Sequence, residues 1–509
     1  MKTKALIIGL SLSTSAFAGD FLTNTNQTID YLRNPARDAA ISLDGVYSNP
    51  AGVAFLPQGV HVGFNWQYAH QTRTVTNTSP SFALGRKNGG NTVKQFEGTS
   101  DAPFIPSLQI AWNKGNWAHQ FNASVTGGGG ACEFSDGLGS FESVVGNIAP
   151  QLVPLGASGY DMNSYMKGRQ YYFGFQLGTA YKINEHLSIY GGLRLLYGTA
   201  TYKAKISNIQ VKLADDGTYV DFGSFLSLST GTIDAGLTQV YDGLEQVQAG
   251  MAQMEAAGAT ALPQYAELQA KNAELMATKT KLEESRGSLD ALQKYSQGVN
   301  LLCNQSSLGL APIVGLDYRV GRWNFAAKYE FKTQIRMKNE STLNEASEIA
   351  VVNKYRDGEK VNEDMPALLT LGAQWNFIDP VRLNLGFHYY FDKAADWYDN
   401  SQELLDHNTY ELLAGVEWDI NDRLTISLGA QTTRYGLTDQ YMNDISFVVN
   451  SYSTGFGANY KLNDVLTLKA GYFSTHYENY DRVISKEPLI SDRFTRTSRV
   501  LGIGCDINL

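Results

Sequence analysis

Seven histidines and three cysteines are the residues of this sequence that first suggest catalytic or metal chemistry. A hydrolase needs a Ser/His or Asp/His set gathered in one place. The histidines are scattered along the chain and no recognisable motif surrounds them. The cysteine spacing fits neither a zinc site nor a disulfide framework. We therefore expect no enzyme activity, no metal and no cofactor. The cysteines are Cys132, Cys303 and Cys505, and the histidines stand at 61, 70, 119, 186, 388, 407 and 476.

A second set of residues could bind an anionic group. Several cations stand at alternate positions of regular segments, so they would share one polar face. A carboxylate-bearing ligand in an apolar interior needs such a partner. The same cations could instead pair with carboxylates of that face, and the sequence leaves both alternatives open. The cations are Arg194, Lys328, Arg382, His388 and Lys469, and the carboxylates are Glu330, Glu411, Glu417 and Asp419.

The elements that would position these residues are alternating strands joined by tight turns. One pattern recurs as YKINEHLSI at 181–189, WDINDRLTI at 418–426 and YKLNDVLTL at 460–468, with a looser copy at 375–383. Each copy joins two alternating strands through an Asn/Asp turn, and both residues suit such turns. Alternation with a period of two indicates strands rather than helices.

Composition favours a β structure in a membrane. Of 509 residues only 18% are charged and 12% are aromatic, whereas soluble domains carry about 25% charged residues. A soluble sandwich would also alternate, but these strands exceed the usual five or six residues, roughly, of soluble sheets. Aromatic residues cluster beside the tight turns, and short turns alternate with long polar loops, as in outer-membrane barrels. The net charge of −9, without a basic patch, argues against a nucleic-acid partner.

We predict an all-β membrane protein whose residues 59–509 form a barrel of fourteen antiparallel transmembrane strands. The number is even, as in single-chain bacterial barrels. The tight turns would face the periplasm and the long loops the outside of the cell, and we expect a monomer. The predicted strands are 59–76, 103–114, 116–130, 168–183, 186–206, 308–320, 322–336, 364–377, 381–392, 408–420, 423–435, 447–461, 464–478 and 495–509.

The N-terminal region has two predicted parts. Residues 1–18 read as a secretory signal peptide, with Lys2 and Lys4 before a short apolar run and a cleavage site that ends at Ala18. Residues 19–58 show no clear period, so they could hang in the periplasm or fill the barrel as a plug. A fourteen-stranded barrel has room for a plug, and burial of the apolar residues between 46 and 56 favours it.

Residues 207–309 form one long predicted external loop. Apolar residues from Val240 to Met254 follow a 4-3-4-3 spacing, and leucines from Leu268 to Leu289 repeat every seven residues. Both are helical heptads. We predict an antiparallel helical hairpin over about 236–297 that either binds an external partner, as an adhesin or receptor would, or buries its own seam and shields the mouth. Cys132 and Cys303 would both lie on the external side, where an oxidising setting permits a disulfide between them.

The segment DGVYSNPAGVAFLPQG at 44–59, directly before the first predicted strand, resembles the hatch of the FadL/TodX family of outer-membrane transporters for long-chain fatty acids and other hydrophobic compounds. The matching motif is Asn49, Pro50, Ala51 and Gly52. The resemblance covers essentially the mature chain except the helical insertion. It implies a place in the bacterial outer membrane, contact with its lipid and lipopolysaccharide, and a hydrophobic small-molecule ligand.

The resemblance also implies a mechanism. Ligand is captured at the external loops, the hatch moves, and the ligand leaves sideways into the outer leaflet through a gap made by an inward kink of the third strand. Gly127, Gly128, Gly129 and Gly130 end the predicted third strand and suit a kink, because glycines permit bulges and bends. The alternative is a strand that ends in a flexible loop. A plugged porin is the nearest rival function.

Overall fold

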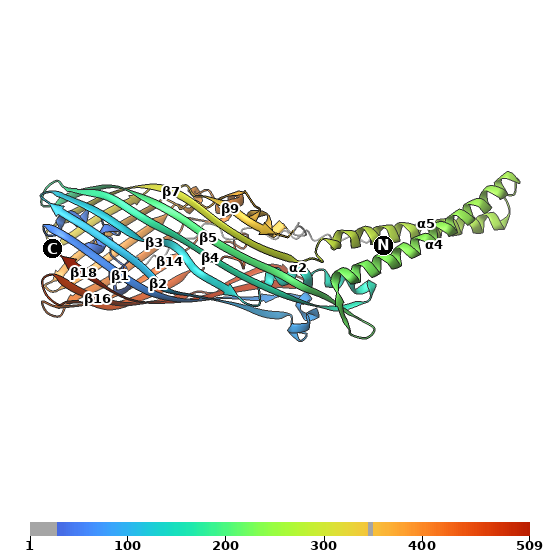
Figure 1. Ribbon diagram of the computed structural model, residues 1–509, viewed down its shortest axis with the longest axis horizontal. Coiled ribbons are helices and arrows are strands. Elements are labelled where there is room, and N and C mark those ends of the chain that lie inside the picture. The colour runs from blue at the N-terminus through green and yellow to red at the C-terminus, as the bar shows by residue number, and fades with distance from the viewer. Residues whose placement is uncertain (1–27, 345–349) are drawn as a thin grey trace.

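The computed structural model describes residues 28–344 and 350–509, so the predicted signal peptide lies outside the described residues. Fourteen antiparallel strands form a closed barrel, because the last strand, β18, pairs with both β16 and the first strand, β1 (Figure 1). The predicted fourteen-stranded barrel is confirmed. Its strands are β1 (Gly59–Thr78), β2 (Val93–Lys114), β3 (Trp117–Phe134), β4 (Ala157–Lys182), β5 (Leu187–Leu213), β7 (Val299–Val320), β8 (Trp323–Glu330), β11 (Leu368–Ile378), β12 (Val381–Tyr390), β13 (Tyr410–Asp419), β14 (Leu424–Arg434), β15 (Ser451–Lys461), β16 (Leu466–Tyr477) and β18 (Leu489–Asn508).

Shorter elements extend the wall at the end with the long loops. β9 (Arg336–Leu343) continues the line of β8 along β7, so the predicted strand 322–336 is interrupted at 331–335 and then resumes. The remaining short strands are β6 (Tyr219–Asp221), β10 (Lys360–Asn362) and β17 (Tyr480–Lys486). The 3-10 helices of the loops are η3 (Pro80–Leu84), η4 (Arg86–Asn88), η5 (Val153–Leu155), η6 (Ala350–Tyr355), η7 (Asp392–Ala394) and η8 (Tyr398–Leu404).

The wall is taller on one side than on the other. β5 has 27 residues, whereas β15 on the opposite side of the barrel has 11. The alternation inverts along β5: up to Tyr197 the apolar residues face outward, and beyond it the outward positions carry polar residues such as Lys203 while Tyr202 and Ile206 point inward and are buried. The sequence prediction placed the starts of β2, β4 and β7 too late, because the tall wall no longer shows an apolar outer face there.

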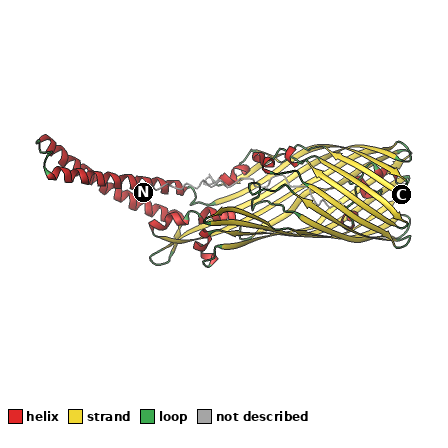
Figure 2. Cartoon of the chain, turned by 180° about the vertical axis from the view of Figure 1, so that it is seen from behind, coloured by secondary structure: helices red, strands yellow, loops and turns green. Residues whose placement is uncertain are grey.

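Residues 28–58, which we call the hatch, lie inside the barrel at the tight-turn end (Figure 2). α1 (Ile29–Arg33) begins at Thr28, whose hydroxyl accepts a hydrogen bond from the backbone N–H of Tyr31, and it ends before Pro35. Such a side-chain cap satisfies one of the open donors of a helix start. Two 3-10 turns follow, η1 (Leu43–Val46) and η2 (Gly52–Phe55).

A pair of long helices projects from the tall wall, away from the tight turns and the C-terminus (Figure 1). α4 (Phe222–Ala256) and α5 (Pro263–Gln293) confirm the predicted helical insertion, although α4 begins well before the predicted start at 236. Leu268, Leu275 and Leu282 each lie over a glycine of α4. Those glycines, Gly250, Gly243 and Gly236, are also spaced by seven, so the two heptads interlock. Among the described residues, no helix is long and apolar enough to cross a membrane.

The interlocking heptads predict the effect of filling one glycine. A Cβ at Gly243 would lie 3.3 Å from a methyl group of Leu275, so Gly243→Leu should push the helices apart and destabilise the hairpin by about 1–3 kcal/mol. Gly231→Leu is the matched control, because a Cβ there meets nothing within 4 Å and helix propensity should rise by about 0.8 kcal/mol. Thermal melting of the helical circular-dichroism signal measures both. Equal melting of the two variants would contradict this packing.

Candidate functional site

The hatch motif is held by polar side chains of the wall. The Asn49 side chain donates to Asp317 of β7 at 2.6 Å and accepts from the backbone N–H of Gly52. A Cβ on Gly52 would lie 2.4 Å from the Asn49 amide nitrogen and 2.9 Å from an Asp317 oxygen, so only glycine fits. Gln120 of β3 donates to the carbonyl of Pro50, and Ser188 of β5 to that of Ala51. All four motif residues therefore take part in anchoring.

Buried ion pairs join the hatch to the opposite part of the wall. Asp30 pairs with Arg33 of its own helix and with Lys469 of β16. Arg33 and Arg37 both reach Glu417 of β13 at 2.8 Å. Charges removed from water need such partners. The hatch therefore fits the wall by charge as well as by shape.

The charge state of Asp30 follows from these neighbours. Burial works to raise the pKa of Asp30, but the positive charges of Lys469, Arg33 and Arg37 hold this pKa well below its usual range. A carboxylate with a lowered pKa stabilises the folded state fully above the ordinary Asp value of about 3.9 and loses that contribution only as the pH falls further. The ion pairs of Asp30 that hold α1 are therefore fully formed at neutral pH.

Each predicted lumen cation is bound to a carboxylate. Arg194 and Lys328 share Glu330, at 2.5 and 2.7 Å, and both lie over the ring of Tyr47 in the hatch. Arg382 pairs with Glu417 and Asp419, and Lys469 with Asp30 and Asp506. His388 lies between Asp38 of the hatch and Glu411. These contacts favour the charge-network alternative over direct binding of a ligand.

The ladder between β2 and β3 is interrupted beside the hatch. Ser107 pairs with Ser124 and Ser100 pairs with Cys132, but the residues between them have no common register. We call this stretch, residues 101–106 of β2 and 125–131 of β3, the window. Pro103 and Pro106 lie in it, and proline cannot donate to a ladder.

The glycine run shapes the β3 side of the window. β3 does not end at Gly130, as predicted, but continues to Phe134, and the register against β4 shifts twice between Val125 and Gly130. Gly128 has φ +98°, and a Cβ there would lie 2.2 Å from the backbone oxygen of Gln170 on β4. Residues other than glycine rarely adopt this conformation. The run therefore builds a bulged strand rather than the flexible loop that was the alternative.

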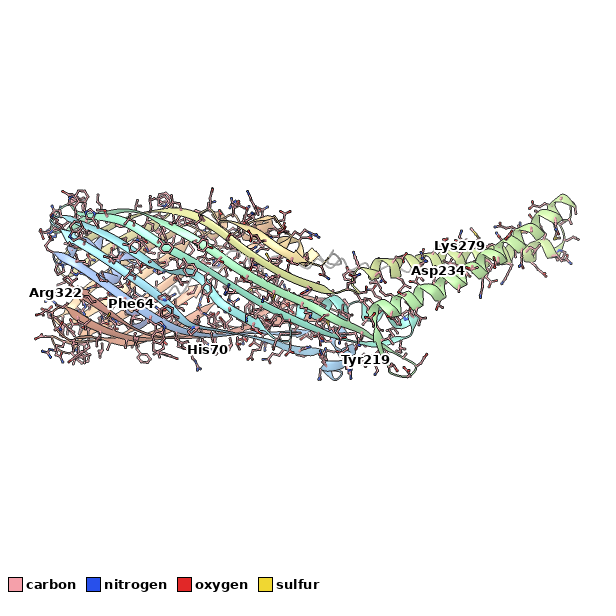
Figure 3. The ribbon with its side chains drawn as sticks, in the orientation of Figure 1. Phe64, His70, Tyr219, Asp234, Lys279 and Arg322 are labelled. Atoms are coloured by element: carbon pink, nitrogen blue, oxygen red, sulfur yellow. The ribbon has the colours of Figure 1, made fainter. Side chains whose placement is uncertain are left out.

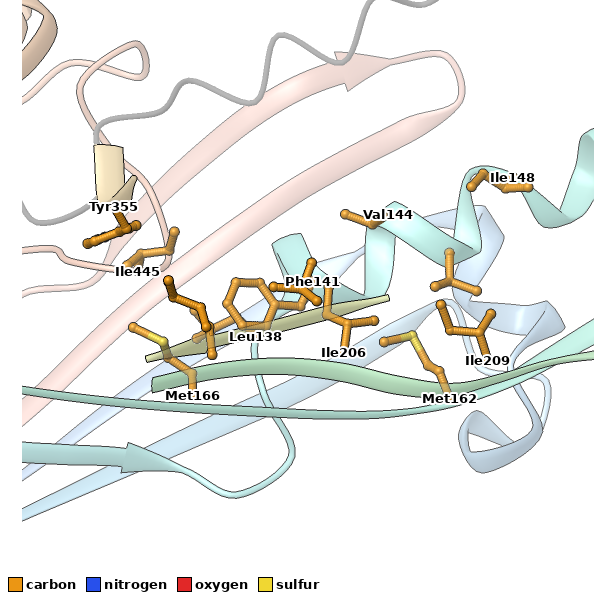
Figure 4. Close-up of a cluster of buried hydrophobic side chains, with 14 of the residues drawn as sticks. Leu138, Phe141, Val144, Ile148, Met162, Met166, Ile206, Ile209, Tyr355 and Ile445 are labelled. Atoms are coloured by element: carbon orange, nitrogen blue, oxygen red, sulfur yellow. The ribbon is translucent and has the colours of Figure 1, made fainter. Parts of the chain in front are cut away.

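Above the window, apolar side chains line the inside of the tall wall. They meet the loop helices α2 (Gly139–Gly146) and α3 (Ala149–Leu152) in one buried cluster, the external cluster (Figure 4). Such a lining can receive the apolar part of a ligand. Its members include Leu138, Phe141, Val144, Ile148, Met162, Met166, Ile206 and Ile209.

The disulfide that the sequence left possible is not formed, because Cys132 and Cys303 are free thiols. Cys132 of β3 pairs with Gly168 of β4, which pairs with Tyr202 of β5, which pairs with Cys303 of β7. Three strand spacings separate the two cysteines, roughly 14 Å in all. A disulfide requires Cα atoms within about 7 Å. The sequence indicated that both cysteines lie at the external end of the barrel, but it could not show that two strands separate them.

Several residues of this site escaped the sequence analysis. Asp30, Arg33, Arg37 and Asp38 supply the hatch half of the charge network, and the only available indication was their density in a segment without a period. Within the described ranges, no three His, Cys, Asp or Glu side chains gather in a way that could hold a metal ion.

The geometry defines a class: a closed β-barrel with an internal hatch and an interrupted wall. Solved structures share the fold of this barrel. The chain is similar to a FadL homologue of Pseudomonas aeruginosa, with a TM-score of 0.61 at 12% identity over 96% of this chain and 100% of that one. It is also similar to the toluene transporter TodX of Pseudomonas putida, with a TM-score of 0.54 at 11% identity over 95% and 98%.

A third similar structure is the toluene transporter TbuX of Ralstonia pickettii, with a TM-score of 0.50 at 10% identity over 94% of this chain and 98% of that one. No family model and no curated protein sequence matches the chain. The chain therefore has the FadL/TodX fold, which confirms the predicted resemblance at the level of structure.

The ion pairs predict how the hatch is released. Lys469→Met leaves Asp506 without its cation and Asp30 with Arg33 alone, and breaking such a buried pair costs about 3–5 kcal/mol. The hatch should then detach and expose Arg33 and Arg37 to trypsin, with cleavage sites mapped by mass spectrometry. Lys461→Met is the matched control, since Lys461 forms an exposed pair with Asp464 that is worth about 0–1 kcal/mol. If the hatch resists trypsin in both variants, the ion pairs of Lys469 do not hold the hatch in the barrel.

Proposed function

We propose that the chain is an outer-membrane channel that admits hydrophobic compounds and releases them sideways through the window. The single observation that carries the proposal is the interrupted β2–β3 ladder beside a lumen that the hatch fills. Residues 1–18 act as the signal peptide, and residues 19–58, of which the structure describes 28–58, act as the plug of the barrel. The protein is not an enzyme and acts as a monomer.

An apolar belt supports the membrane location. Large apolar side chains such as Leu385, Leu501 and Ile503 are more than half exposed on the outer face of the barrel, where a soluble protein would not gather them. Phe64 points outward from β1 in the same way (Figure 3). Aromatic rings line the tight-turn end, as at a membrane interface. The aromatic residues of this rim are Trp112, Trp117, Tyr181, Trp323, Trp375, Trp418 and Tyr460.

The route follows from where apolar surface lies. A ligand first meets the external cluster, whose lining is apolar. Straight passage beyond it leads to the charged hatch, where an apolar molecule gains nothing and would disturb paired charges. The wall near the window offers apolar contacts instead, because Ala102 and Ile105 of β2 pack with Ile29 and Leu32 of the hatch. The window is therefore the favoured exit.

A water-filled porin is the rival function, and the hatch opposes it. The hatch forms ion pairs with β13 and β16 and hydrogen bonds with β3, β5 and β7, so it is attached to the wall on several sides of the lumen. The similar structures named as toluene transporters support a hydrophobic ligand class. The partner-binding role of the helical hairpin stays a prediction.

The window predicts a glycine-dependent uptake. Gly128→Val cannot keep φ +98° or the 2.2 Å approach to Gln170, so the bulge must rearrange at a cost of about 1–3 kcal/mol, and uptake of a fluorescent long-chain fatty acid by cells should fall. Gly191→Val is the matched control, because Gly191 lies on the outer face of β5 with nothing within 4 Å of its Cβ.

Both variants must reach the membrane in equal amounts, measured by heat-dependent gel mobility of the folded barrel. Unchanged uptake by Gly128→Val would remove the window from the route. If the intact protein conducts ions freely and binds no fatty acid, the protein is a porin and the proposed function is wrong.

A further inference from the structure

The loop between β14 and β15 folds into the mouth of the barrel. Its residues 435–450, all of which the structure describes, form neither helix nor strand. Loops usually run over the surface of a protein, but most of residues 441–449 are buried. We call residues 436–450 the flap. The flap is therefore packed inside the mouth and does not lie exposed beside the rim.

Both ends of the flap are anchored to neighbouring segments. The backbone N–H of Tyr435 donates to the Asn450 side chain at 2.9 Å, and the Asn450 carbonyl accepts from the backbone N–H of Glu478 at 2.8 Å. Gly436 packs so closely on His407 that a Cβ would lie 2.0 Å from the His407 carbonyl oxygen. The ends are therefore fixed, and any movement must occur in the span between them.

Part of the flap packs on the wall nearest to it, formed by β1, β17 and β18. Arg482 of β17 donates to the carbonyl of Met442, and Arg496 of β18 donates to that of Phe447. Apolar side chains of the flap and of this wall join in a second buried cluster, which we call the rim cluster. Its members are Val75, Ala395, Trp397, Leu405, Tyr441, Met442, Phe447, Val449 and Phe494.

The middle of the flap reaches the far side of the mouth. The Asp444 carboxylate accepts a hydrogen bond from the backbone N–H of Ser140, in the first turn of α2, at 2.7 Å. α2 precedes β4, which lies on the opposite side of the closed ring of strands from β14. The N-cap residue of α2, Leu138, supplies no side-chain hydrogen bond. Asp444 therefore satisfies an open donor at the start of α2 from across the mouth, where a negative charge is also favourable.

Ile445, the next residue of the flap, is buried in the external cluster, on the side where Tyr355 lies (Figure 4). All other buried apolar residues of the flap belong to the rim cluster. The Ile445 side chain is a hydrocarbon, and apolar linings of this kind receive the apolar parts of ligands. Ile445 therefore covers apolar surface that a ligand in the external cluster would otherwise contact.

We propose that the flap is an outer gate in which Ile445 competes with the hydrophobic ligand for the external cluster. A compound that enters the cluster displaces Ile445, the Asp444 carboxylate leaves α2, and the mouth opens above the window. Without a ligand, Ile445 fills the apolar surface and the flap stays closed. This inference rests on the proposed channel function and adds an entry step that the ligand itself controls.

The flap is held unequally on its two sides, which favours this movement. The rim cluster and two arginines hold it to the near wall. Asp444 and Ile445 hold it to the far side. Local opening starts where buried contacts are few, so the far end is the part that opens. Water can replace the hydrogen bond that Asp444 loses, and the ligand replaces the apolar contacts of Ile445.

The competition predicts that a smaller residue at position 445 tightens ligand binding. The test measures the affinity of the full-length protein in detergent for a neutral fluorescent dye, N-phenylnaphthylamine. Ile445→Ala should lower the dissociation constant of the dye about tenfold. The reason is that the closed fraction of molecules reduces the apparent affinity, and the loss of apolar contacts weakens the closed state.

Val448→Ala is the matched control, because Val448 is a half-buried residue of the same flap that belongs to neither the external nor the rim cluster. It should bind the dye as wild type does, and heat-dependent gel mobility shows that each variant is folded. If Ile445→Ala binds the dye equally well or more weakly than wild type, Ile445 does not compete with the ligand and the gate is wrong, while the channel stands. If folded wild type binds no dye at all, the proposed function itself fails.

The movement of the flap has its own measurement, hydrogen exchange followed by mass spectrometry. The backbone N–H groups of Ile445 and Ser446 are bonded to the Asn443 side chain, so a peptide over 443–446 reports the closed flap. Saturating dye should speed its exchange in wild type. If the dye slows this exchange instead, the flap closes over the ligand and the competition is wrong.

The role of Asp444 is tested by the same exchange without dye. Asp444→Ala should speed exchange of the 443–446 peptide about tenfold, the size expected for one hydrogen bond to a charged group. Asp439→Ala is the matched control, because Asp439 is an exposed residue of the flap that accepts from the Tyr480 hydroxyl at 2.9 Å. Equal exchange in the two variants would show that Asp444 does not hold the flap closed.

Discussion

Buried charge pairing between hatch and wall is the interaction on which the rest of this structure depends. A closed barrel of this width encloses a space that side chains of the wall alone do not fill. The wall lines that space with cations and carboxylates, and the hatch supplies opposite charges at matching heights, as Arg37 does for Glu417 and Asp30 for Lys469. Removing either half would strand the other, because an unpaired buried charge is costly. Hatch and wall therefore specify each other.

Two different surroundings then shape the wall along its height. In the lower part, lipid outside and a polar lumen inside favour apolar residues on the outer face and polar residues on the inner face. In the tall part the outer face meets water. There the polar Lys203 of β5 lies on the outer face and the aromatic Tyr202 lies on the inner face. This exchange creates the external cluster, because the inward positions become apolar just where the loop helices α2 and α3 cover them. The window lies below this cluster, on the same side of the barrel.

Much of this fold follows from sequence patterns that depend on local physics. Tight Asn/Asp turns and alternation indicate the fourteen strands, and the heptads indicate the helical pair, since each pattern reflects neighbours along one element. The heights of β2, β4 and β7 could not be predicted, because the alternation that marks a lipid-facing strand inverts above the membrane. The hatch charges were missed because their partners, Glu417 and Lys469, lie 380 residues away or more. The sequence could not decide whether Cys132 and Cys303 form a disulfide for the same reason, because the strands that separate them are a property of the closed sheet.

The two register shifts in β3 decide which face of the sheet the later side chains of this strand point to. Between Val125 and Cys132, seven residue steps of β3 run beside five of β4, so β3 holds two extra residues. A single extra residue would turn every later side chain to the other face. With two, the alternation resumes in step, and Ser124 below the kink and Phe134 above it are both buried. The strand can thus interrupt its ladder locally and still deliver its upper half to the external cluster, which means that insertions or deletions in this region are tolerable only in even numbers.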